Sequence, residues 1–151
     1  MAYNLKDYLP TTNFGSGRTF SPSLPLIDGV TATSTSSTLP AAIMAKDFNN
    51  VVFAVETTGN ANATIKFTAT TLDSPHDPTT TSTITNQWAP IQVIDLSDGT
   101  SYDGTTGIVI SGTDVHKMFE ANISSLSWIR PMVSSYTTGT IYVYGIASTN
   151  Q

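Results

Sequence analysis

The strongest constraint on the fold is a regular alternation of apolar and polar residues. Between residues 63 and 70, Ile65, Phe67 and Ala69 alternate with polar side chains. Successive side chains of a β-strand point to opposite faces, so this spacing predicts a strand with one face in a core and the other in solvent. Residues 140–145 read Thr-Ile-Tyr-Val-Tyr-Gly and repeat the pattern. The chain is therefore expected to be built from half-buried strands.

Similar strand patterns follow one another along the chain, with turn signals rather than helical stretches between them. We expect two hairpins, one turning near Gly59 and the other near Gly139. Pro90 interrupts one pattern and predicts an edge or bulged strand there. About eight strands at this spacing favour an all-β fold, either an antiparallel β-sandwich or a jelly roll. The expected strands are residues 27–33, 51–56, 63–70, 83–96, 106–110, 115–123 (alternatively a helical turn), 126–133 and 140–146.

Residues 1–25 differ from the rest and are predicted to form an extended N-terminal arm. They combine prolines, glycines and hydroxyl residues with isolated aromatic residues. Such a segment cannot bury enough apolar surface by itself to offset its ordering entropy, so we expect it to lie across another surface. Residues 26–151 are expected to form a single β-sandwich domain. The arm contacts expected are Tyr3, Tyr8, Phe14, Arg18 and Phe20.

Composition argues against several classes of partner. The net charge is −5, and the six basic residues are scattered rather than aligned into a phosphate-binding stripe. No apolar stretch approaches the roughly 20 residues of a membrane span, and the first residues lack the apolar core of a signal peptide. The absence of cysteine excludes a disulfide scaffold and a thiol nucleophile. We expect synthesis in a cytoplasm and no nucleic-acid or membrane partner.

The sequence contains no recognisable catalytic motif. His76 lies in a loop flanked by prolines and His116 follows a turn, and neither is accompanied by a nucleophile motif. A nucleophile elbow, a metalloprotease helix motif and a glycine-rich phosphate loop are all missing. We therefore expect a protein that is not an enzyme and that needs no cofactor.

Three carboxylates could form a calcium site. Asp95, Asp98 and Asp103 lie within nine residues of one another, and Ca²⁺ prefers clusters of oxygen ligands. Their spacing departs from the EF-hand pattern, and Asp-Gly pairs are ordinary turn residues. The prediction is that these residues form turns and that no metal is bound, with calcium as the alternative.

The aromatic residues suggest an interaction surface. Ile141 and Val143 occupy one face of the last expected strand, so Tyr142 and Tyr144 must occupy the other. Paired tyrosines opposite an aliphatic face are common at protein interfaces, although packing on the sheet surface also explains them. Arg130, in an apolar strand, needs a carboxylate partner if it is buried, and Glu120 or Asp114 is expected. A sugar-binding platform is a further alternative, formed by Trp88, Tyr102, Trp128, Tyr136, Tyr142 and Tyr144.

Three features together resemble small structural proteins of tailed-phage virions, especially capsid decoration (cement) proteins. They are the arm, the strand pair 51–56 and 65–69, and the ending formed by residues 128–131 and 134–145. The ending combines an arginine-bearing strand, a Ser/Thr-Gly turn and a closing strand rich in valine and tyrosine. The resemblance covers residues 50–146 and consists of pattern and composition.

This resemblance implies a non-enzymatic virion protein that stabilises a bacteriophage capsid by binding between its subunits. The implied location is the capsid surface, after synthesis in the host cytoplasm. The implied partners are the major capsid protein, contacted by the arm, and sister copies in a homotrimer, contacted by Tyr142 and Tyr144. Two alternatives remain: a tail, connector or fibre component of a virion, and a carbohydrate-binding or adhesion module.

Overall fold

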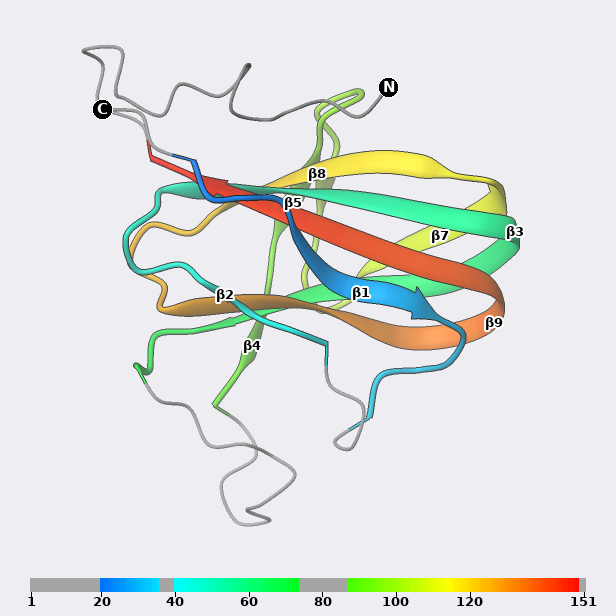
Figure 1. Ribbon diagram of the computed structural model, residues 1–151, viewed down its shortest axis with the longest axis horizontal. Helices are drawn as coiled ribbons and strands as arrows, with labels where there is room; N and C mark the ends of the chain where they lie inside the picture. The colour runs from blue at the N-terminus through cyan, green and yellow to red at the C-terminus, as the bar shows by residue number, and fades with distance from the viewer. Residues whose placement is uncertain (1–19, 36–39, 74–86, 150–151) are drawn as a thin grey trace.

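The computed structural model describes residues 20–35, 40–73 and 87–149, and all structural statements below concern these ranges (Figure 1). They contain nine strands, each paired antiparallel to its neighbours, which confirms the predicted all-β antiparallel fold. Over the same ranges no helix is long and apolar enough to cross a membrane. The strands are β1 Leu24–Val30, β2 Ile43–Met44, β3 Asn50–Thr70, β4 Ala89–Ile91, β5 Val93–Asp95, β6 Ser101–Tyr102, β7 Ile108–Thr113, β8 His116–Asn122 and β9 Trp128–Ser148.

Two strands of 21 residues each, β3 and β9, pair with one another along nearly their whole length. Residues 50–58 of β3 lie beside residues 140–148 of β9, and residues 62–70 lie beside residues 128–138. The two predicted hairpins are therefore wrong, because Gly59 and Gly139 lie at bends in continuous strands rather than at chain reversals. Both ribbons curve round at the same end of the molecule, so one sheet folds over itself into a sandwich (Figure 1).

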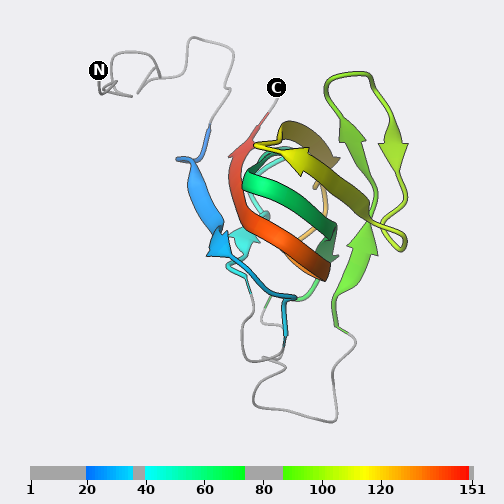
Figure 2. The ribbon, with the colours of Figure 1, turned by 90° about the vertical axis from the view of Figure 1, so that its right-hand side faces the viewer.

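The bend divides the sheet into two layers. The first layer contains β1, the second half of β9, the first half of β3, β8, β5 and β6, in that order. The second layer contains the first half of β9 with β2 on one side, and the second half of β3 with β4 and β7 on the other. Figure 2 shows the curved β3 and β9 ribbons with β1 on one side and the β5–β6 hairpin on the other.

The corner between the layers is held by hydrogen bonds and close contacts among three segments. The Gly59 amide donates to the Asp114 carboxylate at 2.9 Å, and the Asp114 amide returns a hydrogen bond to the Gly59 carbonyl at 3.1 Å. Asp114, between β7 and β8, has a positive φ of 50°. Gly139 lies against Ala61 on the opposite side of β3. The three segments therefore bend at one place, and the pairing of β3 with β9 passes through register shifts there before it becomes regular again from Ile65 opposite Val133.

The core lies between the two layers and is formed by the alternate, inward residues of each strand. Phe53 from the first layer stacks on Phe67 from the second, with ring centroids 4.3 Å apart, and Phe119 lies 6.3 Å from Phe67. Ile141 and Val143 are fully buried, as their alternation predicted. Burying aromatic and aliphatic side chains from both layers stabilises the sandwich, at about 1.5–3 kcal/mol for each large side chain.

The sheet includes residues before β1. Phe20 forms a β-bridge with Ser148, and the Ser21 amide donates to the Ala147 carbonyl at 2.8 Å. Pro90 lies in β4, whose only partner strand in the described part of the chain is β3, so it occupies an edge as predicted. Proline is tolerated at an edge because that strand needs no donor on its outer side.

Candidate functional site

The outward surface of the first layer brings Tyr142 and Tyr144 together with apolar residues from neighbouring strands. Tyr144 lies beside Ala54 of β3, and Ala54 lies beside Met118 of β8. One row along, Ile146 lies beside Val52. In that same row Val52 is paired with Glu120, and Glu120 with Ile94 of β5. The tyrosine face, as we call this surface, consists of Val52, Ala54, Ile94, Met118, Tyr142, Tyr144 and Ile146.

Several apolar side chains of the tyrosine face remain open to solvent. Ile94 is 44% exposed, Met118 48% and Ile146 39%. Tyr142, Tyr144 and Val52 are half-buried. Isolated exposed apolar residues are common on soluble proteins, but a group aligned across four adjacent strands is typical of an interaction surface. The sheet register, rather than any one residue, creates this surface.

Carboxylates surround the apolar residues. Tyr142 lies between Asp28 of β1 and Glu56 of β3. Glu120 of β8 lies in the same row of the sheet as Ile146. His116 also lies on this face, with its Nε2 atom 3.6 Å from Oε1 of Glu56. Partial burial, followed by the charges of Asp28 and Glu56, raises the pKa of Tyr144 above its ordinary value. The tyrosine face therefore suits a partner with apolar and basic groups.

Two open hollows lie along the β5–β8 side of this face. One has a volume of about 460 Å³ and is lined by Leu96, Ser97, His116, Lys117 and Met118. The other, of about 330 Å³, is lined by Ile91, Gln92, Ile94, Glu120 and Asn122. Both are wide and shallow, so they suit side chains of a protein or peptide better than an enclosed small molecule.

The calcium candidates form separate turns in the structure. Asp95 is buried and accepts hydrogen bonds from the Ser97 amide at 2.8 Å and the Ser97 hydroxyl at 2.6 Å. Asp98 accepts from the Thr100 amide, and Asp103 from the amide and hydroxyl of Thr105. Across the described ranges no three histidine or acidic side chains are grouped as metal ligands. The hydrogen bonds are those of turns, as the sequence interpretation favoured.

Asp95 is expected to make stability depend on pH. Its hydrogen bonds with Ser97, assisted by the charge of Lys117 whose Nζ lies 3.6 Å away, lower the pKa of Asp95 in the folded state. A lowered folded pKa means that the stabilisation is present above the unfolded pKa of about 4 and is lost as the pH falls through the folded pKa. Asp95→Asn should cost about 2 kcal/mol at pH 7 and flatten the loss of stability in acid.

Urea denaturation at pH 7 and pH 3 measures this effect. The exposed carboxylate of Asp98 supplies the control, because Asp98→Asn should change the free energy of unfolding less at both pH values. An Asp95→Asn variant that loses as much stability in acid as the parent protein would contradict the role given to Asp95.

The remaining predicted contact residues are only partly within the described chain. Tyr3, Tyr8, Phe14 and Arg18 lie outside it. Phe20 is 38% exposed and lies at the end of β9, opposite Ser148. Sequence reasoning missed Val52, Ile94, Met118 and Ile146 as members of the tyrosine face. The available signal was that these strands carry apolar residues at both odd and even positions, as in Val51-Val52-Phe53.

The six aromatic residues proposed as a sugar platform are divided among different surroundings. Tyr102 packs edge-on against the core residue Phe119, and the Tyr136 hydroxyl donates to the Gly139 carbonyl at 2.7 Å. Trp128 lies beside Thr70 in the second layer, whereas Tyr142 and Tyr144 lie beside Glu56 and Ala54 in the first. A single flat platform of all six is therefore not formed.

The expected ion-pair partners of Arg130 were wrong. Its guanidinium lies over the Trp88 ring, 4.1 Å from the centroid. Glu120 is in the first layer, whereas Arg130 lies beside Thr68 in the second. Asp114 binds the Gly59 amide at the corner. The face of an aromatic ring attracts a positive charge, so stacking on Trp88 stabilises the Arg130 guanidinium at a position away from these carboxylates.

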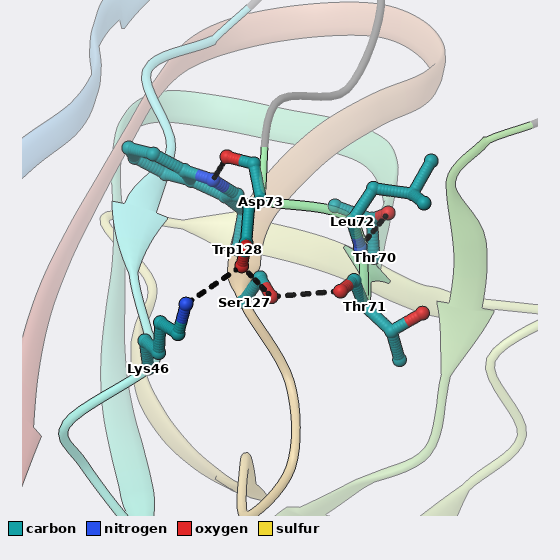
Figure 3. Close-up of polar contacts among 7 residues, drawn as sticks. All are labelled: Lys46, Thr70, Thr71, Leu72, Asp73, Ser127 and Trp128. Atoms are coloured by element: carbon teal, nitrogen blue, oxygen red, sulfur yellow. Dashed lines mark hydrogen bonds and ion pairs between the residues drawn. The ribbon is translucent and has the colours of Figure 1, made fainter.

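Trp128 belongs to a polar cluster that joins three segments at one end of the second layer (Figure 3). The Trp128 indole donates to the Asp73 carbonyl at 3.0 Å, and Lys46 pairs with the Asp73 carboxylate at 2.9 Å. The Ser127 hydroxyl donates to the Thr71 carbonyl at 2.9 Å. The hydrogen bond and charge of Lys46 lower the pKa of Asp73. These contacts fix residues 70–73 against β9 and indicate a structural role.

Comparisons with known proteins identify the fold. No protein-family model matches the sequence, and neither does any curated protein. Two crystal structures have similar folds. The SPBc2 prophage-derived protein YomS is 16% identical with a TM-score of 0.58, covering 87% of this chain and 95% of YomS. The PBSX exported protein XepA is 19% identical with a TM-score of 0.62, covering 88% of this chain and 39% of XepA. The chain thus shares its β-sandwich architecture with YomS over nearly the whole of that protein, and with part of XepA.

Proposed function

We propose that the protein is a non-enzymatic structural component of a phage virion. In this proposal it decorates the capsid surface and stabilises the shell by binding between capsid subunits. Its partners are the major capsid protein and sister copies in a homotrimer. The observation that carries the proposal is the tyrosine face, an open apolar surface that is bordered by carboxylates and built on four paired strands.

The chemistry of that face favours a protein partner. Its two hollows are shallow, and most of the residues that line them lie in β4, β5 and β8, while Gln92, Leu96 and Ser97 lie in the connections next to β5. Aromatic and aliphatic side chains with a polar border are the usual composition of protein interfaces. The fold similarity to a prophage-derived protein makes a virion the first setting in which to test such an interface.

Removal of residues 1–19 is expected to abolish capsid binding while leaving the sandwich folded. The arm supplies spaced aromatic residues that can offset their ordering entropy on a large partner surface. The deletion keeps Phe20 and β1, so the pairing with β9 is retained. Co-sedimentation with purified capsids of the phage that encodes the chain measures binding, and circular dichroism checks the fold.

The second-layer residue Val109, 64% exposed, provides the matched control. A Val109→Lys variant should co-sediment with capsids as the parent protein does. Capsid binding by the truncated chain would contradict the role of the arm. Failure of the full chain to bind capsids would contradict the proposed function, and rings or tubes of purified protein in electron micrographs would favour a tail or connector component.

A further inference from the structure

We propose that residues 1–19 of the same chain bind the tyrosine face in the isolated protein. The proposal goes beyond capsid decoration and does not require it. Its first support is the place where the arm joins the sandwich. Phe20 is opposite Ser148, which lies two residues beyond Ile146 on β9. The arm therefore starts at the border of the tyrosine face.

The length of the arm is sufficient to cross this face. Nineteen residues in an extended conformation span at most about 60 Å. The distance from β9 across β3 and β8 to β5 is three strand spacings, or about 14 Å. A segment tethered at the border of its own binding surface has a high effective concentration there, which favours binding within one molecule over binding to a second copy.

The composition of the arm matches the chemistry of the face. Residues 1–19 contain two basic residues, Lys6 and Arg18, and one acidic residue, Asp7. The face presents Asp28, Glu56 and Glu120 around its apolar residues. Tyr3, Tyr8 and Phe14, together with Leu5 and Leu9, supply large side chains for the two hollows beside β5 and β8. The arm thus offers basic groups for the carboxylates of the face and large apolar groups for its hollows.

Paramagnetic relaxation in the full-length protein tests the proposal. The chain has no cysteine, so Asn13→Cys creates a unique site for a nitroxide label in the arm. We expect the amide signals of Val52, Met118 and Ile146 to lose most of their intensity when the label is oxidised, compared with its reduced form. The signals of Thr68 and Val109, in the second layer, should keep theirs. High salt should weaken the effect, because the Debye length falls to about 3 Å at 1 M.

Two substitutions separate specific binding from chance proximity. Ile146→Lys in the labelled protein should abolish the selective loss of signal, and Met118→Lys provides a second variant at an exposed position of the face. Val109→Lys should leave the loss unchanged. Equal broadening of both layers, or selective broadening that survives both substitutions on the face, would overturn the proposal.

A mixed sample distinguishes binding within one molecule from exchange between copies. Isotope-labelled protein without nitroxide is combined with nitroxide-labelled protein without isotope. Retained signal intensity is expected, and selective broadening of the tyrosine face in this sample would instead show that the arm binds a neighbouring copy. Because capsids are absent from these samples, failure here leaves the capsid co-sedimentation result to be judged separately.

Discussion

Replacement of Phe53 by alanine is expected to lower the free energy of unfolding by about 3–5 kcal/mol. Phe53 is completely buried in the first layer, and its ring stacks on Phe67 of the second. The substitution removes the apolar surface of the ring and leaves a cavity where the two layers meet. A typical domain is stable by only about 5–15 kcal/mol, so most of its stability could be lost.

Denaturation with urea measures the effect of Phe53→Ala. Phe53→Leu should cost less than Phe53→Ala because it fills part of the space, and Val109→Ala, at an exposed position, should change the free energy of unfolding by less than about 0.5 kcal/mol. A loss below about 1 kcal/mol for Phe53→Ala would mean that the Phe53–Phe67 contact does not hold the layers together.

Gly139→Ala is expected to cost about 3 kcal/mol or more, which is an unusually large effect for a single methyl group. Gly139 has a φ of +93°, a conformation that residues with a Cβ atom rarely adopt. A Cβ at this position would lie 2.6 Å from the Cα and 2.7 Å from the Cβ of Ala61. Ala61 is buried and its backbone is paired with Gly112 of β7, so it cannot move away. The two long strands would therefore have to separate at the corner.

Gly59 provides a matched control on the partner strand. It has a φ of +73°, but a Cβ there would meet no atom within 4 Å. Gly59→Ala should therefore cost only about 1–2 kcal/mol, from backbone strain alone. Thermal or urea unfolding of the two variants compares them directly. Equal destabilisation would show that the contact with Ala61 is unimportant and that backbone conformation accounts for both effects.

Sequence patterns located most strands but not their partners. The alternation at residues 63–70 predicted which side chains are inward, and Ile65, Phe67 and Ala69 are all buried. The same pattern did not distinguish a hairpin turn from a bend within a continuous strand, because a glycine with positive φ is suited to both. The hairpin interpretation failed at Gly59 and Gly139 for this reason. Pairing of residues 50–58 with 140–148 depends on contacts between segments about 90 residues apart, which local patterns do not specify.

The tyrosine face shows the same division between local and tertiary information. Alternation placed Tyr142 and Tyr144 opposite Ile141 and Val143, and the structure has them so. The neighbours of the tyrosines could not be predicted, since Ile94 and Met118 reach the face only through the register of β5 with β8 and of β8 with β3. The prediction of a single sugar platform was wrong because it grouped residues by chemical type, and these aromatic residues lie in different layers.

The sequence by itself determined the class of fold and, where residues alternate clearly as in 63–70 and 140–145, the face that each residue occupies, because the two-residue period of a β-strand is a local property. Only the tertiary structure decided that two long strands bend together at Gly59 and Gly139, and that four strands align their outward apolar residues into one surface. Strand pairing is a contact between distant segments, and its register is fixed by how the two layers pack around Phe53 and Phe67.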